Sequence, residues 1–142
     1  MAHQVNVFLA DRPGRLERLT AVLADKGINI RAITIAGSEG FGVAKLLVDR
    51  PEEAHEALHR EGFSAHLKDV LAVVMDDRPG GLHAVCAALG RKGVNIEDAY
   101  GFVVKDRELA VLVMEVEKVP EAESILREAG FTIMGDQELY GL

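Results

Sequence analysis

An internal repeat constrains the fold of this chain more than any other feature of its sequence. The tetrapeptide Asp-Arg-Pro-Gly at 11–14 recurs at 77–80, and Gly-Ile-Asn-Ile at 27–30 recurs as Gly-Val-Asn-Ile at 93–96. A gapless alignment of the two surrounding regions gives 11 identities in 24 positions. A repeat of this length indicates two copies of one structural unit, so each half predicts the fold of the other.

The repeat also places the boundary between the two units. Leu58, Gly62 and Phe63 recur 68 residues later, and the two extra residues fall in a Gly/Ser-rich stretch where a hairpin turn tolerates an insertion. We therefore expect one domain at 1–68 and a second at 69–142. No Pro/Gly/Ser-rich linker separates them, which predicts that the last strand of one half runs directly into the first strand of the next.

Hydrophobic periodicity gives the same element order in both halves. Apolar residues alternate in the opening strand, and helical spacing follows the Asp-Arg-Pro-Gly turn. A hairpin, a second helix opened by Pro51 or Pro120, and a last strand from Phe63 or Phe131 complete each half. The order βαββαβ predicts an α+β, ferredoxin-like fold, with an antiparallel four-stranded sheet and two helices on one face in each domain. The expected hairpin strands are 28–36 with 41–48, and 94–104 with 109–116.

Composition excludes several classes of function. The formal net charge of -7 disfavours nucleic acid and anionic membrane surfaces as partners. No apolar run approaches the roughly 20 residues that cross a bilayer, and we expect no signal peptide at the N-terminus. The single cysteine excludes an internal disulfide and a multi-thiolate metal site. We therefore expect a cytoplasmic protein with neither nucleic acid nor membrane as its partner.

One motif suggests a metal site, and the repeat argues against it. His55-Glu56-Ala57-Leu58-His59 matches the HExxH pattern of zinc proteases. In the second half, however, Glu123 and Arg127 take the places of the two histidines. The simpler interpretation is therefore that both histidines are surface residues. We expect no metal site and no cofactor, and because no acid–base pair or activated nucleophile can be assembled, we expect no enzyme activity.

The two repeated motifs carry the functional information. For folding alone, Asp would cap the helix, Pro would lie in its first turn, and the glycine of the second motif would end it. The asparagines Asn29 and Asn95 are harder to explain in this way, because Asn is unfavourable in strands. A helix N-terminus attracts a carboxylate, and an adjacent acidic residue attracts an ammonium group. Together these groups suit the head of an α-amino acid.

These motifs, in this order and spacing, resemble the ACT family of small-molecule-binding regulatory domains over essentially the whole chain. In that family the ligand is usually an amino acid and lies between two domains, against the strand–helix loop of one and the second strand of the other. Several members have Asn at the acidic loop position, where both halves here have Asp. The resemblance implies a site in each half: Asp11, Pro13, Gly14, Asn29 and Ile30; and Asp77, Pro79, Gly80, Asn95 and Ile96.

We therefore expect an allosteric regulatory protein that binds a free amino acid and modulates a metabolic enzyme or regulator. The alternative is a structural, subunit-like assembly protein that uses paired ACT sheets without a ligand. Burial of exposed sheet edges by pairing predicts a homodimer. The second strands, about 28–36 and 94–103, are expected to pair within one chain, which brings the Asp11 loop near Asn95 and the Asp77 loop near Asn29. The competing geometry pairs like halves of two chains.

Overall fold

The computed structural model describes residues 2–104 and 109–142. The turn in which we placed the two-residue insertion of the second hairpin lies largely outside the described residues. The chain divides into an N-terminal unit of residues 3–68 with 140–142, and a C-terminal unit of residues 69–139 with Ala2. The fold is α+β and ferredoxin-like, as the element order predicted. None of the described helices combines the length and the apolar character that crossing a membrane requires.

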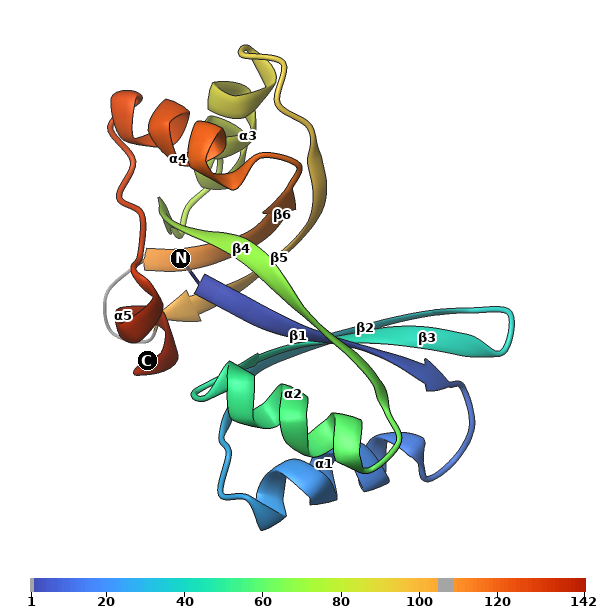
Figure 1. Ribbon diagram of the computed structural model, residues 1–142. Coiled ribbons are helices and arrows are strands. Elements are labelled where there is room, and N and C mark those ends of the chain that lie inside the picture. Colours follow the sequence, from blue (N-terminus) through green and yellow to red (C-terminus); the bar gives the residue numbers. More distant parts are fainter. Residues whose placement is uncertain (1, 105–108) are drawn as a thin grey trace. The chain divides into compact units, whose positions relative to one another are not determined.

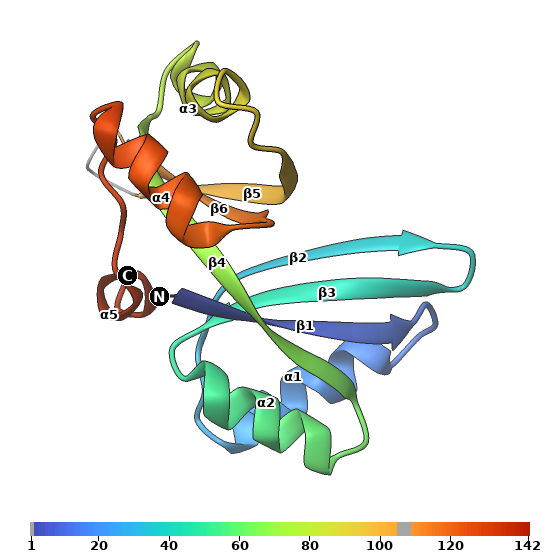
Figure 2. The ribbon, with the colours of Figure 1, turned by 45° about the horizontal axis from the view of Figure 1, so that its top comes forward.

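The N-terminal unit has two helices on one face of an antiparallel sheet. Figure 1 and Figure 2 show α1 and α2 side by side beneath the strands. The strand order is β2-β3-β1-β4, with β3 antiparallel to both β1 and β2. The elements are β1 (Ala2–Ala10), α1 (Arg15–Asp25), β2 (Ile30–Ser38), β3 (Phe41–Val48), α2 (Pro51–Arg60) and the first part of β4 (Ser64–Asp76).

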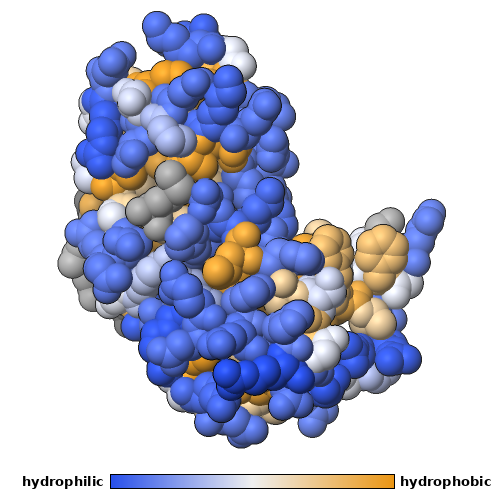
Figure 3. All heavy atoms as spheres, viewed as in Figure 1, coloured by the Kyte–Doolittle hydropathy of each residue, from blue (hydrophilic) through white to orange (hydrophobic). Residues whose placement is uncertain are grey.

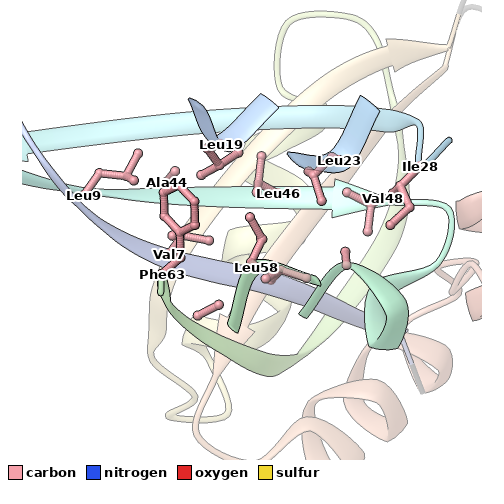
Figure 4. Close-up of a cluster of buried hydrophobic side chains, with 13 residues drawn as sticks. Val7, Leu9, Leu19, Leu23, Ile28, Ala44, Leu46, Val48, Leu58 and Phe63 are labelled. Atoms are coloured by element: carbon pink, nitrogen blue, oxygen red, sulfur yellow. The ribbon is translucent and has the colours of Figure 1, made fainter. Parts of the chain in front are cut away.

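The core of this unit lies between the helices and the sheet. Figure 4 shows Leu19 and Leu23 of α1 meeting the inward side chains of the strands. Val5, Val7 and Leu9 of β1 are all buried, and Phe8 between them is 48% exposed. The inward positions of the predicted alternation are therefore confirmed, but Asn6, expected on the other side of the strand, is buried as well at 8% exposure.

The C-terminal unit repeats this arrangement. Here α3 and α4 lie side by side on one face of the sheet, as Figure 2 shows. The strand order is β4-β6-β5, with β6 antiparallel to both neighbours. The elements are the second part of β4, α3 (Gly81–Gly90), β5 (Ile96–Val104), β6 (Leu109–Val116), α4 (Val119–Glu128) and α5 (Asp136–Tyr140).

The last strand is formed differently in the two halves. In the first half it continues without interruption into the opening strand of the second, giving the 13-residue β4. In the second half the strand expected from Phe131 is reduced to one antiparallel bridge between Val73 and Ile133. Two backbone hydrogen bonds of 2.9 Å flank this bridge, and Gly135 then leads into the short helix α5, which the sequence did not predict.

The helix ends confirm one expectation and correct another. Gly27 and Gly93 have φ of 66° and 74°, as expected for glycines that end a helix in the left-handed region. The aspartates do not cap the following helices, however. Gly14 and Gly80 hold the N-cap positions with φ of 88° and 87°, and no side chain caps either helix. Only glycine adopts this φ without strain, so the glycine takes the N-cap position. Asp and Pro therefore precede the helix.

The second strand of each half is a sheet edge. β2 pairs with β3 alone and β5 pairs with β6 alone. The expected pairing of these two strands with each other stays a prediction. Ile33 and Ile35 on β2 are 42% and 47% exposed. Figure 3 shows apolar atoms gathered over the hairpin end of β2 and β3, where Phe41 is 56% exposed.

Candidate functional site

The two strand–helix turns are built on the same plan. In each, the glycine carbonyl accepts the first helical hydrogen bond at 3.0 Å, from Arg18 N to Gly14 O and from Ala84 N to Gly80 O. The Asp11 backbone N–H donates to Gly40 O at 2.9 Å, which ties the first turn to the β2–β3 hairpin. The turns therefore present a helix N-terminus without a side-chain cap, next to an exposed aspartate.

The acidic and amide side chains of the two motifs are available to a ligand. Asp11, Asn29, Asp77 and Asn95 are all exposed. Over residues 2–104 and 109–142, none of these four side chains has a hydrogen bond or ion pair. The Asn29 backbone, in contrast, is held by Asp49, whose carboxylate accepts from its N–H at 3.1 Å. The fold thus holds the backbone in place and leaves the amide group free.

The isoleucines of the motifs are less exposed than the acidic and amide side chains. Ile30 and Ile96 are partly buried and pack against the cores of their units. Their side chains stabilise the start of β2 and β5 from inside, as expected for apolar side chains on the inner face of a sheet. Of the residues assigned from the resemblance, these two therefore offer a ligand mainly their backbone.

Within one unit, the two motifs lie at opposite ends of the sheet. Ala10, just before the Asp11 turn, pairs with Phe41, and Phe41 pairs in turn with the last residue of β2. Asn29 precedes the first residue of β2, at the far end. The 11-residue helix α1 connects the two ends, and a helix of that length spans about 16 Å. One unit cannot therefore bring its own aspartate and asparagine to the same small ligand.

The space beside the turn is occupied differently in the two units. In the N-terminal unit the guanidinium groups of Arg15 and Arg18 lie over the Phe63 ring, with Cζ 5.2 and 5.0 Å from its centroid. In the C-terminal unit Gly81 and Ala84 take the places of the arginines. Here a cavity of about 720 Å³ is lined by the turn, by α3 and by the segment after α4. The difference between Arg15 and Gly81 is visible in the sequence, but nothing there reveals the cavity.

The HExxH histidines do not form a metal centre among the described residues. No group of three or more His, Cys, Asp or Glu side chains there could hold a metal ion. His55 is half-buried, and its Nε2 donates to Ala65 O at 3.0 Å, so this nitrogen carries a proton and has no lone pair for a metal. His59 is exposed, and its ring stacks on that of His55 with centroids 6.3 Å apart. The role of His55 is to hold α2 against β4.

We expect His55→Ala to lower the free energy of unfolding by about 1 kcal/mol, because the Ala65 carbonyl loses its partner. His59→Ala should change it by less than about 0.5 kcal/mol, since the side chain is exposed. Urea unfolding followed by circular dichroism measures both. Zinc retained after dialysis by the wild type and lost in the double variant would contradict this assignment.

One phenol is held in its neutral form. The pKa of Tyr100 on β5 is raised, first by burial and then by the nearby carboxylates of Asp98 and Glu115. Tyr100 lies opposite Val113, on the sheet face that points away from α3 and α4. A neutral phenol at physiological pH can donate a hydrogen bond but cannot act as a base.

Comparisons with known proteins agree with this architecture. The family model described as an ACT domain pair matches residues 1–142. A protein of known structure from Bacteroides thetaiotaomicron is 31% identical, with a TM-score of 0.93 over 99% of this chain and 96% of that one. No curated protein matches at a significant level.

More distant structures share the fold. The regulatory subunit of aspartate kinase from Thermus thermophilus is 21% identical, with a TM-score of 0.66 over 90% of this chain and 92% of that one. The corresponding subunit from Thermus flavus is 22% identical, with a TM-score of 0.61 over 89% and 91%. With the family model covering both halves and their repeated turns, the chain belongs to the family of ACT domain pairs.

Proposed function

We propose that this chain is a non-catalytic regulatory module that binds a free amino acid and modulates a partner enzyme. The observation that supports this most directly is that both halves hold the same pair of exposed groups, an aspartate and an asparagine, without a partner in the described structure: Asp11 and Asn29, and Asp77 and Asn95. Side chains that recur at equivalent places without a structural role are available for recognition. Membership of a family of regulatory ligand-binding domains supports this function, as does the fold shared with aspartate kinase regulatory subunits.

The chemistry of the turn suits a zwitterion. The free N–H groups at the start of α1 or α3 attract the ligand carboxylate. Asp11 or Asp77 beside them attracts the ammonium group, while the asparagine amide can donate to one group and accept from the other. Pro13 and Gly14, with their counterparts Pro79 and Gly80, shape the turn. The ligand class is therefore an α-amino acid.

A complete site requires a second ACT unit, because each unit holds its aspartate and asparagine at opposite ends. A second copy of the chain can supply it through the edge strands. Two edge strands that pair antiparallel bring the turn of one unit next to the asparagine of the other. The exposed Ile33 and Ile35 on β2 favour such pairing, since an open apolar edge is a liability for a monomer. The proposed assembly is thus a homodimer with sites between subunits.

A thermal-shift screen of the twenty amino acids tests the function. A ligand at about 100 times its Kd adds roughly 2.7 kcal/mol to the free energy of unfolding. For a chain of this size we expect a rise in Tm of roughly 10 °C. Asn29→Ala or Asp11→Ala should abolish part of the rise while leaving the ligand-free Tm within about 2 °C, because neither side chain has a structural partner.

The control is Glu17→Ala on the exposed face of α1, which should leave the response intact. If the protein dimerises through the β2 edge but responds to none of the twenty amino acids, the proposal that its ligand is an amino acid is refuted. That result would favour a structural assembly protein, a function that the exposed isoleucines of β2 also support. A response that is left undiminished by both Asn29→Ala and Asp11→Ala would refute the site at these residues.

A further inference from the structure

The N-terminal unit shows what fits over the phenylalanine at the start of its last strand. Phe63 is only 3% exposed, since it belongs to the core cluster of its unit and Arg15 and Arg18 lie over its ring. A guanidinium within about 6 Å of a ring centroid is attracted by the negative face of the aromatic system. The Arg18 guanidinium also donates to Glu61 O at 2.7 Å. The Arg15 Nε is buried and has no hydrogen-bond acceptor among the described residues.

The C-terminal unit has the same ring without the cations. Phe131 corresponds to Phe63 and remains partly exposed, and it lines the cavity together with Gly81 and Ala84. Gly81 cannot be replaced by a larger residue without movement, because a Cβ there would overlap the Asp76 carbonyl oxygen. The turn, including Gly81, lines the cavity of about 720 Å³ together with Phe131, and Gly81 and Ala84 stand where the other half has Arg15 and Arg18.

Asp76 and Arg78 both line this cavity, together with the start of α3. Asp76 lines it, where the N-terminal unit has the uncharged Ala10. The Asp76 carboxylate pairs with Arg78 at 2.9 Å, but the two side chains are 52% and 74% exposed. An ion pair this exposed is weak and exchanges readily for another partner. A ligand cation can therefore contact an aromatic face and donate to a carboxylate. In the described part of the other half, Arg15 Nε has no such acceptor.

We infer that this cavity binds the guanidinium group of a small molecule, which replaces in the C-terminal unit the arginine side chains of the N-terminal unit. The planar cation stacks on Phe131 and donates to the Asp76 carboxylate, while its aliphatic chain lies against Ala84 and the turn. Arginine-like compounds and guanidino amines are the ligand class. The site shares Pro79 and Gly80 of the turn with the amino-acid site proposed above, but it uses neither the Asp77 carboxylate nor Asn95.

The probe is agmatine, which has a guanidinium group but no α-amino-acid head. Its control is N-carbamoylputrescine, which has the same length and the same amine but a neutral urea in place of the guanidinium. Isothermal titration of the full chain should show agmatine binding at least about tenfold more tightly than the urea. Equal affinities, or no binding of agmatine, would overturn the proposal.

Two variants locate the site. Ala84→Arg places a guanidinium over Phe131, as Arg18 does over Phe63, and should reduce agmatine affinity at least about tenfold. Asp76→Asn keeps the shape of the cavity, removes its carboxylate and should cost about tenfold as well. If Ala84→Arg does not fold, Asp76→Asn decides alone. Agmatine binding unchanged in Asp76→Asn would place it elsewhere and refute the site.

Asn95→Ala separates this proposal from the function proposed above. Agmatine should bind this variant with unchanged affinity, whatever happens to the amino-acid response. Loss of agmatine binding in Asn95→Ala would assign the guanidinium to the amino-acid site and contradict a separate cavity site.

Discussion

Leu23→Ala is expected to lower the free energy of unfolding of the N-terminal unit by about 3–4 kcal/mol. Leu23 is fully buried on α1 and packs in the cluster between the helices and the sheet (Figure 4). Its truncation removes apolar burial and leaves a cavity, because Leu19 and Leu58 around it are held by their own elements. Urea unfolding monitored by circular dichroism measures the loss, with one m-value fitted to the wild type and the variant.

The control for this prediction is Leu16→Ala on the same helix. Leu16 is 40% exposed, so its truncation should cost less than about 1 kcal/mol. Because a homodimer is proposed, both variants are compared at a dilution where the midpoint no longer depends on protein concentration. Equal losses for the two leucines would show that the core does not lie where the structure has it.

Gly81→Ala is expected to destabilise the C-terminal unit by about 2–4 kcal/mol, although alanine is a better helix former. A Cβ at Gly81 would overlap the Asp76 carbonyl oxygen, so the end of β4 and the start of α3 must move apart. The Gly81 N–H bond to Arg78 O at 2.9 Å would be strained by the same movement. Thermal unfolding and the agmatine titration should both register this change, because Gly81 also lines the cavity.

Gly90→Ala, at the other end of α3, is the matched control. No heavy atom lies within 4 Å of a Cβ built there. The substitution should be neutral or raise the free energy of unfolding by up to about 1 kcal/mol, through the loss of freedom in the unfolded chain. If Gly81→Ala were tolerated as well as Gly90→Ala, the close approach of β4 to α3 would be wrong.

The repeat and the local periodicities were enough to predict the fold class and the element order. Alternation of period two places Val5, Val7 and Leu9 inside, and helical spacing places Leu19 and Leu23 inside, because these patterns depend only on backbone geometry. The glycines that end α1 and α3 were predictable for the same reason, since a positive φ is a local requirement. The family also followed from the sequence, because both repeated motifs occur in register in the two halves.

Other features depend on atoms that are distant in sequence, and only the tertiary structure decided them. The N-caps are Gly14 and Gly80, because the path from strand to helix, and not the residue preference of a cap, sets the backbone there. The cavity beside Phe131 is lined by residues of three separate segments, and Gly81 and Ala84 line it where the other half has Arg15 and Arg18 over Phe63. Local sequence patterns predict which residues are buried. Sheet edges and cavities depend on how separate segments pack, and a short stretch of sequence does not determine that packing.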